Sequence, residues 1–160
     1  MRPWTAPRTP DTNPGGNAGA GPVLLATFDV PFDPAAAQFA VRAALDANRA
    51  LIVANVVELS PNGFNMRVRA DILGYPRDME ASLLAPVESA VSLGVPVERL
   101  RVQSPHRVAA LVELARERDA GLVVLGPDRR RVNRRLYLRA AKAIRDRLEC
   151  LLWLPVDSAG

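Results

Sequence analysis

Cysteine, histidine and lysine each occur only once in the chain, as Cys150, His106 and Lys142. A single thiol cannot close an internal disulfide bond or, alone, hold a metal ion, and we expect Cys150 to be an inert, packed residue. His106 has no second histidine, paired cysteine or serine–aspartate pair to work with, so we expect a surface residue. No arrangement of residues is typical of a catalytic site, which favours a protein that is not an enzyme.

Long apolar runs are also absent, since none approaches the roughly 18 residues that a membrane-spanning helix needs. Arg2 is not followed by an apolar stretch, so we expect no secretory signal and a cytoplasmic protein without membrane contacts. The composition, 49% hydrophobic and 24% charged, is that of an ordinary globular protein. A chain of 160 residues is long enough for one domain with a sizeable core and a tail.

Residues 1–22 are rich in proline and glycine, and Trp4 is their main apolar anchor. Such a segment buries too little surface to offset the entropy lost on ordering, so we expect a flexible tail. Two interpretations of Trp4 stay open: it docks on the domain, or it has no function. We place the folded domain at residues 23–156.

The rest of the chain alternates between short apolar segments and longer segments with apolar residues at helical spacing. The pattern predicts five strands, at residues 23–29, 51–57, 97–103, 121–125 and 150–155. It predicts four helical segments, at residues 34–47, 79–93, 104–120 and 132–147. This alternation indicates right-handed crossovers and an α/β fold, with a doubly wound, mostly parallel sheet between two layers of helices.

Cap and turn residues mark the ends of these elements. Asp33 is expected as the N-cap of the first helix, and Gly94 as the stop after the second. Ser104-Pro105 is expected to cap and start the third helix, which Gly121 ends. Pro86 lies inside the second helix and removes a hydrogen bond, so we expect a kink or two shorter helices. Residues 59–77 form a long connection without a predicted structure.

Positive charge gathers in one segment, although the net charge of the whole chain is only +4. Its basic residues are Arg129, Arg130, Arg131, Arg134, Arg135, Arg139, Lys142, Arg145 and Arg147. They follow the fourth predicted strand, at the kind of strand–loop–helix junction where open parallel sheets bind ligands. Two interpretations stay open: an anion or nucleotide site, and a solvated loop. A nucleic-acid partner is not expected, because no aromatic residues alternate with the arginines.

Several motifs follow one another in the order and spacing of a known family. They are an apolar strand ending near Asp29, Asn-Val-Val-Glu (55–58), Gly-Val (94–95), Ser-Pro (104–105), Ala-Gly-Leu-Val-Val-Leu-Gly (120–126) and Cys-Leu-Leu-Trp-Leu (150–154). Over residues 22–155, the chain resembles the universal stress protein family. The resemblance implies a Rossmann-like fold similar to that of the adenine nucleotide alpha hydrolases, with strand order 3-2-1-4-5.

Many members of this family bind ATP through a loop after the fourth strand, with the pattern Gly, two residues, Gly, nine residues, Gly-Ser or Gly-Thr. On this chain Gly126 matches the first glycine, Arg129 replaces the second, and Arg139-Ala140 replaces the final pair. Glycine lets main-chain amides approach a phosphate closely, so the large side chains here argue against ordinary ATP binding.

Two further family positions lie near the adenosine. The aspartate of the first strand aligns with Phe28, and Asp29 comes one residue later, on the opposite face of a regular strand. Val56 matches a valine of the second strand, although any core has an apolar residue there. The resemblance thus implies these candidate nucleotide- or anion-binding residues: Asp29, Val56, Gly126, Arg129, Arg139 and Ala140.

The resemblance also implies a stress-response or regulatory module that takes no cofactor and acts as a homodimer, with other protein partners left open. In the family the last strand commonly pairs across a two-fold axis, and an uncharged apolar edge strand needs a cover. The expected interface residues are Leu151, Leu152, Trp153 and Leu154, although Trp153 also suits a core position. The alternative is a switch or slow ATPase in which arginines hold the phosphates of ATP or AMP.

Overall fold

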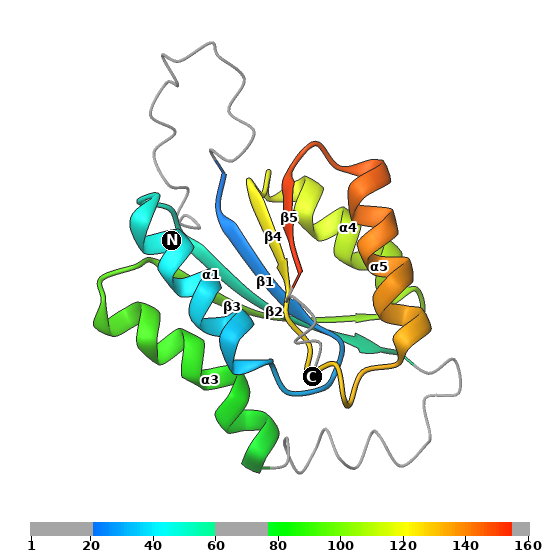
Figure 1. Cartoon of the computed structure of the whole chain (residues 1–160), viewed down its shortest axis with the longest axis horizontal. Helices are drawn as coiled ribbons and strands as arrows, with labels where there is room; N and C mark the ends of the chain where they lie inside the picture. Colours follow the sequence, from blue (N-terminus) through cyan, green and yellow to red (C-terminus); the bar gives the residue numbers. More distant parts are fainter. Residues whose placement is uncertain (1–20, 60–76, 155–160) are drawn as a thin grey trace, which may run out of the picture.

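The computed structural model describes residues 21–59 and 77–154, which form a three-layer α/β/α domain (Figure 1). Its strands are β1 (Val23–Thr27), β2 (Leu51–Glu58), β3 (Val97–Ser104), β4 (Leu122–Leu125) and β5 (Leu151–Trp153). Its helices are α1 (Pro34–Asp46), α3 (Arg77–Ser92), α4 (Arg107–Glu117) and α5 (Arg134–Arg147). The predicted tail, apart from residues 21 and 22, and most of the long connection lie outside the described residues.

The five strands form one parallel sheet in the order β3-β2-β1-β4-β5, which confirms the predicted fold class and strand order. In the central strand β1, Ala26 lies opposite Ala54 of β2 and Leu125 of β4. All five residues of β1 are buried. A strand with helices over both faces has no solvated side, so it is apolar throughout instead of alternating.

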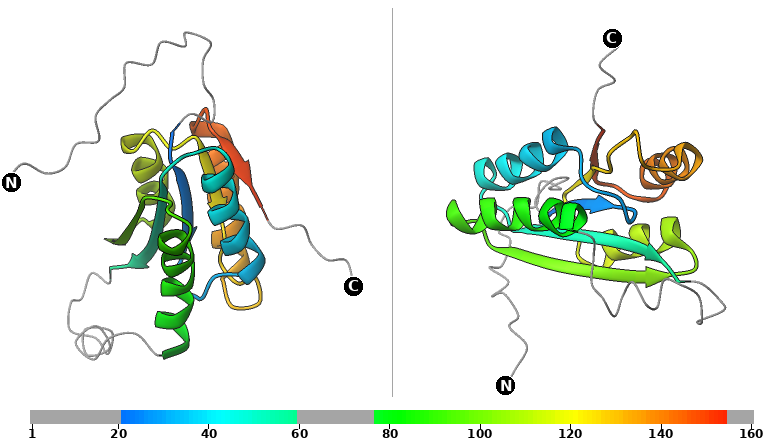
Figure 2. Two further views of the ribbon diagram at one scale, coloured as in Figure 1. Left: turned by 90° about the vertical axis from the view of Figure 1, so that its left-hand side faces the viewer. Right: turned by 90° about the horizontal axis from the view of Figure 1, so that it is seen from below.

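Helices α4 and α5 cover one face of the sheet and helices α1 and α3 cover the other (Figure 2), and a separate core lies beneath each pair. Leu24, Ala26 and Phe28 pack in the core beneath α4 and α5. Val23 and Leu25 pack in the core beneath α1 and α3. The period of two along β1 therefore decides which pair of helices each side chain meets.

Helix α1 begins as predicted, because a side-chain oxygen of Asp33 accepts a hydrogen bond from the Ala35 amide at 2.9 Å. The prediction of two shorter helices around Pro86 was wrong, since α3 is a single helix of 16 residues. Pro86 is buried among the residues that α3 turns toward the domain. That packing offsets the one hydrogen bond that proline cannot donate.

The predicted bounds of the third helix were also wrong. Ser104 ends β3, and its hydroxyl oxygen accepts a hydrogen bond from the His106 amide at 3.0 Å, so α4 begins only at Arg107. At the other end, Asp119 takes the left-handed conformation with φ 50°. The turn after α4 is therefore made two residues before Gly121, by an aspartate that tolerates this backbone region.

Candidate anion and nucleotide site at the carboxyl ends of the strands

Strands β1 and β4 lie side by side at the centre of the sheet, and the loops that follow them meet at its carboxyl end. In open α/β sheets such a switch point holds the ligand. Here the backbones of the two loops join. The Asp33 amide donates to the Gly126 carbonyl at 2.8 Å, and the Asp128 amide donates to the Pro31 carbonyl at 2.8 Å. Phe32 and Pro127 form an isolated β-bridge. The two loops thus satisfy each other's polar groups across the switch point.

The loop between β4 and α5 also bonds to itself. The amides of Arg131 and Val132 both donate to the Asp128 carbonyl at 3.0 Å. The Arg130 amide donates to a carboxylate oxygen of Asp128 at 3.0 Å. This turn was not predicted, although Gly-Pro-Asp is a typical turn sequence. Asp128 therefore occupies loop amides with its own oxygens and adds a negative charge there.

The structure explains the glycine at position 126 by close packing and not by ligand binding. Its amide donates to the Ala26 carbonyl at 2.9 Å, and its φ lies outside the left-handed region. A Cβ atom added to it would lie 2.9 Å from Leu25 Cδ1 and 3.2 Å from Ala36 Cβ. The bare backbone is needed here because α1 and its preceding loop pack closely on the end of β4.

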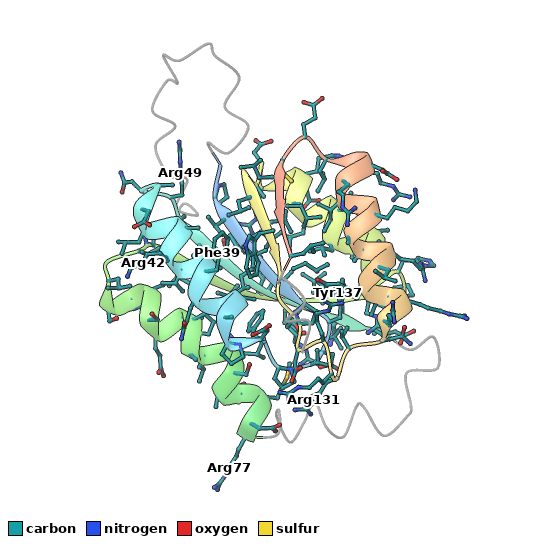
Figure 3. The ribbon with its side chains drawn as sticks, in the orientation of Figure 1. Phe39, Arg42, Arg49, Arg77, Arg131 and Tyr137 are labelled. Carbon is teal, nitrogen blue, oxygen red and sulfur yellow. The ribbon has the colours of Figure 1, made fainter. Side chains whose placement is uncertain are left out.

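Arg129 lies over an aromatic ring at the start of α5. Its guanidinium carbon is 5.0 Å from the centre of the Tyr137 ring, a cation–π distance. Tyr137 is buried and lies on the inner side of α5 (Figure 3). A cavity of about 360 Å³ opens beside this pair, lined by Arg129, Arg130, Val132, Arg134 and Tyr137. Three cations at one cavity can attract an anion.

Arg139 and Ala140 lie in the second turn of α5 and not in a loop. The helix starts early because Asn133 caps it, with a side-chain oxygen that accepts from the Leu136 amide at 3.1 Å. Ala140 is completely buried, whereas Arg139 is exposed. Arg139 lines a second cavity that Arg129 does not line. The structure therefore does not bring the two candidate arginines together in one cavity.

Strand β1 ends at Thr27, two residues earlier than predicted, and Asp29 has a left-handed backbone with φ 57°. The rule of alternating faces does not apply to Asp29 because it lies outside the strand. Its side chain is exposed, and its amide donates to the side-chain oxygen of Asn55 at 2.7 Å. Asn55 is 3% exposed and holds this turn, a role that was not predicted from the sequence. The sequence did contain a signal for such a role, because an asparagine inside an apolar strand needs a hydrogen-bond partner when it is buried.

Phe28 and Val56 belong to the core beneath α4 and α5, and neither lines the cavity beside Arg129 or the cavity that Arg139 lines. Phe28 is 2% exposed and Val56 is fully buried. The phenyl ring thus fills space at the position that aligns with the family's aspartate. Apolar packing of this kind is what any core favours.

One cation of the cluster forms a contact with the opposite helical layer. Arg131 Nη1 is 3.1 Å from a carboxylate oxygen of Asp78 in the first turn of α3, and Figure 3 shows Arg131 on that side of the loop. This hydrogen bond lowers the pKa of Asp78 below its usual value. Arg131 therefore connects the β4–α5 loop to α3, and its charge is partly neutralised.

The four candidate interface residues lie at the β5 edge of the sheet. Leu151 is 58% exposed, whereas Leu152 and Leu154 pack against the core beneath α5, and Trp153 packs against the opposite core. Cys150 is partly buried, and this burial raises the pKa of its thiol. Burial of this kind disfavours the reactive thiolate.

His106 precedes α4 as an exposed residue. Within residues 21–59 and 77–154, no group of three histidine, cysteine or carboxylate side chains is arranged to hold a metal ion. Among the described helices, none has the length and apolar character to cross a bilayer.

A family model and several solved structures match this chain, and all of them belong to one family. The model of the universal stress protein family matches residues 20–153. A crystal structure of a family protein from Burkholderia pseudomallei is 20% identical with a TM-score of 0.61, covering 88% of this chain and 98% of that chain. The universal stress protein of Archaeoglobus fulgidus in complex with dAMP is 18% identical with a TM-score of 0.56, covering 84% and 96%.

A universal stress protein in complex with cAMP is 20% identical with a TM-score of 0.54, covering 86% of this chain and 98% of that chain. A comparison with curated proteins gave no significant match. The three structures share the fold at low identity, and the family match spans nearly all of the described domain. The chain belongs to the universal stress protein family.

Proposed function

We propose that this protein is a non-enzymatic, stress-response or regulatory member of its family that acts as a homodimer and does not bind ATP through the usual glycine loop. The observation that carries this proposal is the closed β4–α5 loop. Its amides at Gly126, Asp128, Arg130, Arg131 and Val132 each donate to an oxygen of the protein itself. A phosphate held by that loop would have to displace these bonds and approach the Asp128 carboxylate.

The positions that replace the family's glycines strengthen this argument. The side chain of Arg129 stands over Tyr137, and Arg139-Ala140 continues a helix whose Ala140 is fully buried. A buried helical alanine has no hydroxyl group and no room beside it for a phosphate. The core position of Phe28 likewise provides no carboxylate for a ribose.

Calorimetric titration with ATP, AMP and cAMP tests the proposal, since complexes with dAMP and cAMP are described for two proteins of the same fold. We expect no binding heat and no thermal shift at millimolar nucleotide. Micromolar affinity for any of the three that is retained in Arg139→Ala would refute it.

The alternative function is an ATP- or AMP-binding switch in which arginines replace the loop amides. The cavity beside Arg129 and Tyr137 favours it, because guanidinium groups bind phosphates strongly. In that case Arg129→Ala would abolish nucleotide binding. Arg145→Ala, which removes an equal charge from α5 at a position outside this cavity, is the matched control.

The homodimer part of the proposal rests on the β5 edge. β5 pairs with β4 along one side, and Leu151 exposes 58% of its surface without a charged neighbour in the strand. An exposed apolar strand edge is a template for pairing, and pairing with a second copy would cover it. Sedimentation equilibrium at micromolar concentration gives a dimer mass if the proposal is right, and a strictly monomeric mass removes it.

A further inference from the structure

A second cavity, of about 310 Å³, lies where the start of α4 faces α5. It is lined by Glu58, Pro105, His106, Arg107, Val108, Ala109, Leu136, Arg139 and Arg147. Its residues come from the end of β2, the β3–α4 turn, the first turn of α4 and the length of α5. It is thus separate from the cavity beside Arg129 and from the contacts between the β1–α1 and β4–α5 loops.

The charges around this cavity are unbalanced. Three guanidinium groups line it, from Arg107, Arg139 and Arg147, against one carboxylate, from Glu58. Arg107 Nη2 is 3.7 Å from a Glu58 carboxylate oxygen, which neutralises one of the cations. For Arg139 and Arg147 the described part of the chain provides no side-chain ion pair. Like charges brought to one cavity repel each other unless an anion lies between them.

The two unpaired cations both belong to α5. Arg139 and Arg147 are eight residues apart, a little more than two helical turns, and both are exposed residues that line the cavity. The main chain of Arg147 contacts the last turn of α4, because its carbonyl accepts a hydrogen bond from Arg116 Nη2 at 3.3 Å. Packing of α4 against α5 therefore brings Arg139 and Arg147 to the wall of the same cavity as Arg107.

The walls of the cavity limit what it accepts. A volume of about 310 Å³ lies near the lower end of the range for small-molecule sites. The planar fork of a guanidinium group donates two parallel hydrogen bonds to two oxygens of a phosphate, and three such groups exceed what a single carboxylate ligand would need. Leu136 and Val108 add apolar wall that suits a small organic part.

We propose that the α4–α5 cavity binds the phosphate groups of a small phosphorylated molecule, held by Arg139 and Arg147, with Arg107 exchanging Glu58 for the ligand. This goes beyond the proposed function, because it names the chemical class of an effector and places it between α4 and α5, away from the observed β4–α5 loop. The arginines bind and position the phosphate, and no bond is made or broken.

Inorganic pyrophosphate is the probe, titrated into the full-length protein by calorimetry at fixed pH and ionic strength. Arg139→Ala and Arg147→Ala should each weaken binding about tenfold or more, as expected for the loss of a charge-assisted hydrogen bond. Arg145→Ala, which removes the same charge from the same helix but lies outside the α4–α5 cavity, should change the affinity less than about threefold. Equal losses in all three variants would show only general attraction to a basic surface and would overturn the proposal.

His106 provides an independent readout because it lines this cavity and is the only histidine of the chain. Its imidazole protons give one set of NMR signals, which should shift with pyrophosphate in the wild type and in Arg145→Ala but not in Arg139→Ala. Unchanged histidine signals at saturating pyrophosphate would place the anion elsewhere. Pyrophosphate binding without ATP binding supports both proposals, whereas ATP binding that depends on Arg129 but not on Arg139 defeats only the proposed function.

Discussion

Trp153 of β5 stacks on Phe39 of α1, with ring centroids 4.4 Å apart and planes inclined by 13°. The contact joins the last strand to the first helix, which are far apart in the sequence. Trp153 is therefore occupied by packing within its own domain, as a core position requires. The outward apolar surface of β5 is left mainly to Leu151, which is 58% exposed.

Replacement of Trp153 by alanine should destabilise the protein by about 2–3 kcal/mol, because it removes a large half-buried side chain and an aromatic pair. Urea denaturation of the two proteins at the same concentration measures the difference. The control is Leu151→Ala, which should cost under about 1 kcal/mol because that side chain is mostly in solvent. Similar losses in both variants would mean that the stack does not hold β5 in place.

Replacement of Leu151 by lysine should convert the proposed dimer into a monomer without unfolding it. A lysine on an edge strand prevents pairing, since its charge would be buried in the interface. Light scattering after gel filtration measures the mass, and circular dichroism checks the fold. Asp46→Lys, at the exposed end of α1, is a control that should leave the mass unchanged. A dimer that survives Leu151→Lys would place the interface away from β5.

Replacement of Gly126 by alanine should destabilise the fold by about 1–3 kcal/mol, because the added methyl group would lie 2.9 Å from Leu25 Cδ1. Denaturant unfolding measures this loss. Ala35→Gly in the first turn of α1 is a control for a change of one methyl group at an exposed position. If Gly126→Ala left stability unchanged within about 0.3 kcal/mol, the close packing of α1 on β4 would not explain the glycine.

The ion pair between Glu80 and Arg99 should make a small contribution to stability that depends on pH. Both carboxylate oxygens of Glu80 accept from Arg99, at 3.0 and 2.9 Å, and this hydrogen bonding lowers the pKa of Glu80 below its usual value. Since the folded pKa is the lower one, the stabilisation is fully present above the unfolded pKa and is lost as pH falls through the folded pKa.

Comparison of the wild type with Glu80→Gln tests this pH dependence. At neutral pH the substitution should cost under about 1 kcal/mol, because both side chains are about one third exposed and solvent screens the pair. The difference should disappear in acid, below the folded pKa. A difference that persisted unchanged in acid would show that the glutamine disturbs packing and that the ion pair is not its cause.

Much of the fold followed from local patterns. The apolar runs at β1, β2 and β4 are short and bounded by turn residues, and Asp33 before Pro34 is a strong helix start, so these elements were predicted near their observed places. Predictions failed where tertiary contacts outweighed local preference. Pro86 was expected to kink a helix or to divide it in two, and the division was wrong because α3 is a single helix in which Pro86 is buried.

The candidate site was less predictable because its geometry depends on pairs of loops. The sequence showed that the arginines of the β4–α5 loop form a charged segment, but it did not show which residues they contact. Arg131 bonds to Asp78, 53 residues away, and the Asp33 amide bonds to the Gly126 carbonyl. Neither pairing leaves a signal in the local sequence. Arg107 and Arg147 were not predicted to share a cavity for the same reason.

By itself, the sequence determined the α/β architecture and the concentration of positive charge after β4, since both arise from residue types and their spacing. Only the tertiary structure decided what Gly126, Arg129 and Arg139 do. Gly126 gives room to α1, Arg129 lies over the ring of Tyr137, and Arg139 lines a cavity between α4 and α5 together with Arg147. These roles depend on which elements the parallel sheet brings together, and long-range packing sets that arrangement, not local preference.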